Sequence, residues 1–128
     1  MKIYLAQFNP IVGDLDGNAE KIINISLDAF KSSADLVLTP ELSLWGYPPK
    51  DLLFNRSLIK KQNKILNKLS IDIANKFGNL SVIIGIAETI DDNFYPNLYN
   101  SIALIEKGKW SVIAVSYTHL TLPTINWV

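Results

Sequence analysis

The pattern of hydrophobic and polar positions predicts strands and helices that alternate along the chain. Short apolar runs bounded by turn residues are typical of buried strands, whereas apolar residues at steps of three and four form one face of a helix. We expect strands over residues 2–8, 36–38, 81–88 and 99–105, and a fifth that begins near residue 110. We expect helices from the turn at residues 9–17 to about residue 30, and over residues 56–77. This alternation predicts a layered α/β fold.

Each predicted helix has one apolar face and its own end signals. The first presents Ala19, Ile22, Ile23, Ser26, Leu27 and Phe30, and Asp16 or Asn18 is placed to cap its N-terminus. The second presents Ile59, Gln62, Leu66, Leu69, Ile73 and Phe77, and Gly78 predicts its C-terminal end.

Composition excludes several functional classes. Twelve basic and twelve acidic residues cancel, so no net charge attracts nucleic acid or an anionic membrane. No apolar run reaches the roughly 18 residues that a membrane span needs. Met1 leads directly into the first apolar run, and we interpret this beginning as the start of a cytoplasmic protein. The chain has no cysteine, so it holds no disulfide, thiolate metal site or cysteine nucleophile. Its single histidine, His119, cannot form a histidine-rich metal site.

Glu41 is the candidate catalytic residue because it follows the predicted strand at residues 36–38. Functional groups in α/β sheets gather beyond the carboxyl ends of strands. Pro40 fixes the backbone on one side of Glu41, and partial burial there would suit a general base or acid. On these features alone, a solvated glutamate or a helix cap is the commoner outcome.

The residues around Glu41 carry a family resemblance. Residues 36–47 (LVLTPELSLWGY) resemble the first catalytic segment of the nitrilase, or carbon–nitrogen hydrolase, superfamily. Residues 48–53 (PPKDLL) look like the signature of the glutaminase domain of glutamine-dependent NAD synthetases. Residues 6–18 and 99–103 (YNSIA) are similar to other strands and turns of that family, so the resemblance extends over about residues 1–113.

The resemblance implies an incomplete αββα sandwich of the nitrilase type, with residues 1–114 as the N-terminal part of a glutaminase domain. Members of this superfamily use a Glu-Lys-Cys triad, in which the cysteine attacks the glutamine side-chain amide and releases ammonia through a thioester. Glu41 matches the triad glutamate, the base that takes the thiol proton. Neither the lysine nor the cysteine can be assigned, since Lys107 and Lys109 lie in a predicted turn where we expect solvated side chains.

The function implied is that of the N-terminal part of a glutamine-hydrolysing NAD synthase. Ammonia would amidate nicotinic acid adenine dinucleotide in a C-terminal synthetase domain, to which ATP and magnesium belong. We therefore expect no cofactor or metal in this segment, glutamine and the synthetase domain as partners, and a homo-oligomer as the full-length enzyme. The segment alone is expected to be inactive, because it lacks the cysteine.

Two alternatives remain open from the sequence. A free-standing nitrilase-type amidase or carbamoylase would share Pro40-Glu41-Leu42 without needing residues 48–53. A non-catalytic α/β interaction module would have no site at all.

Several other residues allow more than one interpretation. Tyr47 is expected to form one wall of the substrate pocket, although packing of Trp45 and Tyr47 against the loop is an equal alternative. We expect Lys50 and Asp51 to be structural, and Asn100 can equally be a hydrogen-bonded strand residue.

The last residues of the chain depart from the family pattern. Residues 116–128 (SYTHLTLPTINWV) have no counterpart in the family and resemble translated sequencing-adaptor sequence. We interpret residues 115–128, with His119 among them, as a non-native tail, and a genuine divergent tail is the alternative.

Overall fold

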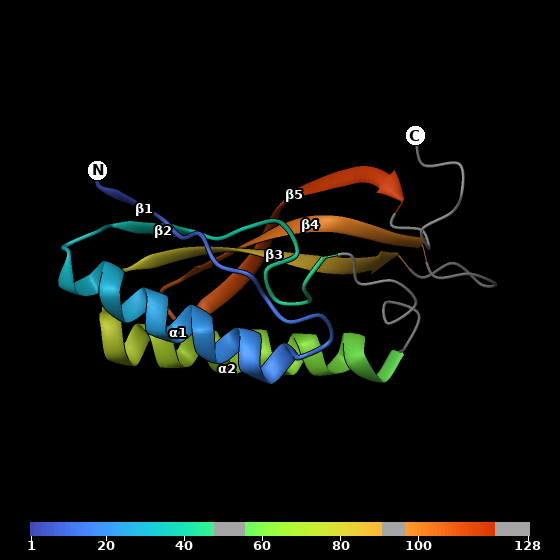
Figure 1. The fold of residues 1–128 in the computed structure, drawn as a ribbon, viewed down its shortest axis with the longest axis horizontal. Helices are drawn as coiled ribbons and strands as arrows, with labels where there is room; N and C mark the ends of the chain where they lie inside the picture. The colour runs from blue at the N-terminus through green and yellow to red at the C-terminus, as the bar shows by residue number, and fades with distance from the viewer. Residues whose placement is uncertain (48–55, 91–96, 120–128) are drawn as a thin grey trace.

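The computed structural model describes residues 1–47, 56–90 and 97–119, which form a five-stranded sheet with two helices against it (Figure 1). The strands are β1 (Ile3–Leu5), β2 (Leu36–Leu38), β3 (Ser81–Ile90), β4 (Asn97–Glu106) and β5 (Lys109–His119). The helices are α1 (Leu15–Lys31) and α2 (Arg56–Phe77). Both lie on the same face of the sheet (Figure 1).

The sheet is mixed, and its spatial order follows the order of the strands in the chain. β1, β2 and β3 run parallel, with Leu5 opposite Leu38 and Leu38 opposite Ile83. Parallel neighbours need a long crossover, which α1 supplies between β1 and β2 and α2 between β2 and β3. β4 and β5 continue the sheet as antiparallel strands, with Gly85 opposite Ile102.

The core lies between the helices and one face of the sheet. Val37 of β2 and Ile84 of β3 are fully buried there, as are Ile22 of α1 and Leu66 of α2. The predicted face of α2 is confirmed, since five of its residues are buried: Gln62, Leu66, Leu69, Ile73 and Phe77. The predicted bounds of α2 and the stop at Gly78, which has a φ of 59°, are confirmed as well.

The opposite face of the sheet is apolar and only partly covered by the described residues. Ile3 and Leu5 are 52% and 68% exposed, and Leu38 and Ile102 lie on the same face with exposures near 40%. One helical layer and one sheet make up half of an αββα arrangement, which confirms the predicted α/β class and incomplete sandwich. The expectation of a buried first strand over residues 2–8 is wrong, because β1 has three residues and helices on one side only.

The start of α1 also differs from the prediction. Asp14 caps the helix by accepting a hydrogen bond from the amide of Gly17, so the predicted caps Asp16 and Asn18 both lie inside the helix. Leu27 and Phe30, predicted on the buried face, are 38% and 48% exposed, because the buried stripe of α1 runs through other positions. These buried positions are Leu15, Asn18, Ile22, Ser26 and Ala29.

The later strands are longer than the apolar runs that predicted them. β3 extends beyond its predicted range of residues 81–88, and β4 extends beyond residues 99–105. β5 continues past residue 115, where we expected the non-native tail to begin, as far as His119. Residues 48–55, 91–96 and 120–128 lie outside the described residues.

Candidate active site

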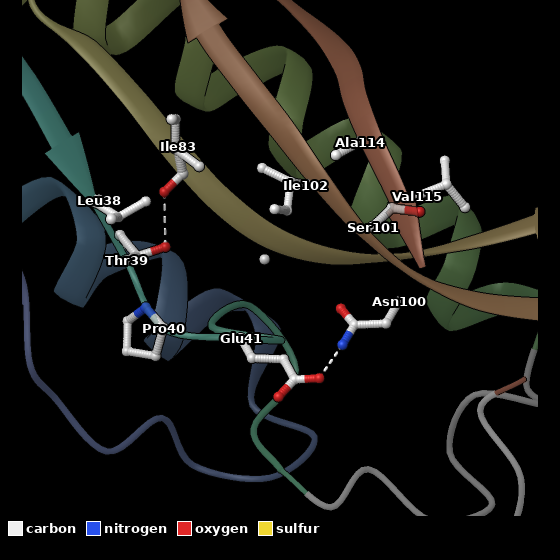
Figure 2. A pocket seen from close by; sticks show the side chains of 11 residues that line it. Leu38, Thr39, Pro40, Glu41, Ile83, Asn100, Ser101, Ile102, Ala114 and Val115 are labelled. Carbon is white, nitrogen blue, oxygen red and sulfur yellow. Dashed lines mark hydrogen bonds between the residues drawn. The ribbon is translucent and has the colours of Figure 1, made fainter. Parts of the chain in front are cut away.

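A hollow of about 450 Å³ opens on the face of the sheet opposite the helices, at the carboxyl end of β2 (Figure 2). Glu41 lies at its rim with Pro40, while Ile83, Ile102 and Ala114 of the three following strands form its apolar floor. The position predicted for Glu41, just beyond a strand end, is thus confirmed. Within the described residues the Glu41 side chain is exposed.

The backbone after Glu41 turns sharply over β3. Leu42 has a φ of 48°, a left-handed conformation that a bulky side chain rarely adopts. Its carbonyl accepts hydrogen bonds from the amides of Trp45 and Gly46, both at 2.9 Å, and its side chain is fully buried. Strained residues of this kind persist only where the surroundings hold them.

A chain of buried hydroxyls attaches this turn to β3. Thr39 Oγ1 donates to the carbonyl of Ile83 at 2.8 Å, which uses its single proton. Ser43 Oγ is therefore the donor in its 2.7 Å bond to Thr39 Oγ1. Ser43 Oγ in turn accepts from the amide of Gly85 at 3.1 Å. Every donor in this chain of bonds has a partner, and the two residues that flank Pro40-Glu41-Leu42 are therefore fixed to the sheet.

Two buried amide side chains secure the rest of the loop. Asn18 of α1 donates to the carbonyls of Ile11 and Leu44 and accepts from the amide of Ile11, which joins the first loop to the turn. Gln62 of α2 accepts from the indole of the fully buried Trp45 and bonds both backbone groups of Ala87 on β3.

Asn100 of β4 contacts Glu41 directly. Its Nδ2 donates a hydrogen bond to Glu41 Oε1 across the mouth of the hollow (Figure 2). The sequence left the role of Asn100 open, and the structure places it both in a strand and against the candidate base. The pairing joins residues 59 positions apart, so only the strand order and register reveal it.

The structure separates the remaining candidates from Glu41. Lys107, with a φ of 54°, begins the tight turn between β4 and β5, and Lys109 follows it. Both lie at the end of β4 away from Asn100, about 20 Å along the strand at roughly 3.4 Å per residue. Tyr47 is 55% exposed and is not among the residues that line the hollow, whereas Trp45 packs in the core.

Lys50 and Asp51 lie outside the described residues, and of His119 only its place at the end of β5 is described. Within the described ranges, no three histidine, cysteine, aspartate or glutamate side chains gather as a metal site would require. None of the described helices is long and apolar enough to span a bilayer.

Comparison with known proteins relates this site to one family. The carbon-nitrogen hydrolase family matches residues 2–128, a range that includes residues 115–128, which we interpreted from the sequence as a non-native tail. A glutamine-dependent NAD(+) synthetase from Synechocystis is 40% identical over 107 residues, which cover 84% of this chain and 19% of that protein. The structure of glutamine-dependent NAD+ synthetase from Acinetobacter baumannii superposes with a TM-score of 0.73 and 35% identity, over 89% of this chain and 20% of that one.

A third relative has another activity in its name. An arylacetonitrilase from Arthroderma benhamiae is 32% identical over 118 residues, which cover 85% of this chain and 34% of that protein. The chain thus spans about a fifth of the length of the synthetases that it matches and a third of the nitrilase. The match over residues 2–128, together with the shared fold, shows that this chain belongs to the carbon-nitrogen hydrolase family.

Proposed function

We propose that this chain is the N-terminal part of the glutaminase domain of a glutamine-dependent NAD synthase. The observation that carries the proposal is the position of Glu41 in a segment similar to such synthetases, at a strand end and on the rim of an open hollow. In this proposal the ammonia released from glutamine amidates nicotinic acid adenine dinucleotide in a C-terminal synthetase domain. The proposed full-length enzyme is a cytoplasmic homo-oligomer.

Glu41 acts as the base in the proposed reaction. Its carboxylate takes the proton of a cysteine thiol, and the thiolate attacks the side-chain amide carbon of glutamine. The carbon–nitrogen bond breaks as Glu41 returns the proton to the leaving ammonia, and a thioester remains. Water then hydrolyses the thioester to glutamate and regenerates the thiol. The chain has no cysteine, so in this proposal the nucleophile lies outside it, and no lysine of the chain is assigned to the triad.

The proposal places no ATP or magnesium site in this chain. No cluster of three acidic or histidine ligands is present among its described residues. The sequence also lacks a glycine-rich phosphate loop. The proposal therefore assigns both to the synthetase domain.

Glu41→Gln in the full-length protein tests the proposal, with glutamine and ammonium compared as nitrogen donors. We expect glutamine hydrolysis and glutamine-dependent NAD formation to fall by about 10²–10⁴-fold, the range of a lost general base. NAD formation from ammonium should persist, because it bypasses this site. Glu20→Gln, on the exposed surface of α1, is the matched control. Undiminished glutamine hydrolysis by Glu41→Gln would refute the assignment.

A nitrilase-type amidase is the second candidate, and the similarity to an arylacetonitrilase favours it. This enzyme would hydrolyse simple amides or nitriles with the same carboxylate and would have no synthetase domain. Assays of the full-length protein with glutamine, short amides and arylacetonitriles separate the two. Turnover of nitriles or amides without ATP-dependent NAD formation would replace the first proposal with this one.

A further inference from the structure

We propose that Asn100 is a positioning residue for Glu41, one that fixes the carboxylate in the orientation needed for proton transfer. The inference rests on the proposed catalytic role of Glu41. The contact that carries it is the hydrogen bond from Asn100 Nδ2 to Glu41 Oε1 (Figure 2). One carboxylate oxygen is thereby engaged, and Oε2 has no part in this bond.

The two partners are held by independent parts of the fold. Asn100 lies on β4, an interior strand, opposite Ala87 of β3 and Ser116 of β5. The next residue, Ser101, is fully buried and donates to a carboxylate oxygen of Glu88 at 3.1 Å. The donor is therefore fixed by strands on both sides.

Glu41 lies on a turn whose flanking residues are fixed, but its own side chain is long and exposed. Thr39 and Ser43 hold the backbone on either side of it through the hydroxyl chain to β3. An exposed glutamate loses rotamer freedom when it is ordered, and that entropy opposes a single orientation. The bond from Asn100 supplies the restraint that the turn does not give, and a base placed in advance of reaction needs less reorganisation.

The chemistry of asparagine suits this task. A carboxylate only accepts hydrogen bonds, so the amide must present Nδ2 to Glu41 and turn its carbonyl oxygen away. Figure 2 shows that oxygen directed away from Glu41, on the side of Ser101 and Val115. A neutral donor orders the carboxylate without placing a second full charge beside it. Aspartate at this position would have the same shape but would repel Glu41.

Asn100→Ala in the full-length protein tests the inference through steady-state glutamine hydrolysis. We expect kcat to fall about tenfold or more and KM to change less than twofold, since the lost bond orders the base and not the substrate. Ammonium-dependent NAD formation should be unchanged. Asn67→Ala is the matched control, because Asn67 also makes a bond between side chains, accepting from Trp110 Nε1 at 2.7 Å, but lies on α2. Its kcat should equal that of the wild type.

The double variant Glu41→Gln/Asn100→Ala decides whether Asn100 acts through Glu41. If it does, Asn100→Ala lowers kcat no further once Glu41 is replaced, since coupled residues are not additive. An equal fall in both backgrounds would overturn the inference, as would a change confined to KM. If Asn100→Ala turns over glutamine at the wild-type rate while Glu41→Gln does not, the positioning role of Asn100 is overturned and the proposed function stands. Undiminished turnover by Glu41→Gln would instead refute the proposed function.

Asn100→Asp keeps the test valid if the alanine variant folds poorly. It preserves the volume of the side chain, so we expect thermal unfolding close to that of the wild type. It removes the donor and also places a second carboxylate beside Glu41, so we expect a fall in kcat at least as large. Wild-type kcat in a folded Asn100→Asp variant would contradict the positioning role.

Discussion

Gly85 lies directly beneath the backbone of Leu42, so close that a Cβ atom at position 85 would come within 2.3 Å of the Leu42 nitrogen. The same atom would lie 2.7 Å from the carbonyl oxygen of Pro40. Both neighbours are backbone atoms and cannot move aside as a flexible side chain can. The absence of a side chain at Gly85 is therefore what allows the turn that bears Glu41 to pack on β3.

We predict that Gly85→Ala in the full-length protein displaces this turn and impairs glutamine hydrolysis. Overpacking of this kind costs about 1–3 kcal/mol of stability, and the displaced backbone includes Glu41 itself. Thermal unfolding and kcat measured on the same preparation test both effects. Gly78→Ala is the control, because Gly78 has open space around it and only the strain of its positive φ, roughly 1 kcal/mol. Equal kcat in the two variants would contradict the prediction.

Ser43→Ala should destabilise the same turn by a different route. It leaves the buried amide of Gly85 without its acceptor, which costs about 1–3 kcal/mol. Thr39→Val removes the acceptor of the Ser43 hydroxyl and should cost a similar amount. Because both variants break one chain of bonds, the double variant should lose less than the sum of the two. Strict additivity in thermal unfolding would show that the two hydroxyls act independently.

Replacement of Lys107 and Lys109 by alanine should leave glutamine hydrolysis unchanged. Lys107 begins the turn between β4 and β5, and Lys109 is the first residue of β5, so both lie at the opposite end of β4 from Asn100. A triad lysine must lie beside the base and the nucleophile, so neither position fits. The loss of a catalytic group is expected to lower the rate by at least about 10²-fold. A fall in kcat of more than about tenfold in the double variant would therefore mean that one of the two lysines reaches the site.

The sequence predicted best those features that depend on local pattern. The face of α2 repeats over five turns, so Leu66, Ile73 and Phe77 were identifiable as core residues. Glu41 was placed correctly at the end of β2 because a proline after a short apolar run disfavours continuation of a strand. Both predictions use only neighbouring residues.

Features that depend on the tertiary arrangement were not predictable. Ile3 and Leu5 look like residues of a buried strand, and their exposure follows from helices that cover one face only. Asn18 is a residue type that often caps helices, and its burial depends on three backbone groups from two separate segments, at Ile11 and Leu44. The bond from Asn100 to Glu41 requires β4 to lie beside β3 in a particular register, which no local pattern contains.

The agreement between the order of strands in the sheet and their order in the chain has a consequence for folding. Each strand hydrogen-bonds to the strand synthesised just before it, so no place in the sheet must be kept open for a later segment. The connections from β3 to β4 and from β4 to β5 are short, which favours rapid pairing of these strands, whereas the parallel pairs of β1, β2 and β3 must wait for the helical crossovers between them. The sheet can therefore be built strand by strand from the β1 edge, and the contact of Asn100 with Glu41 depends on β3, which lies between β2 and β4.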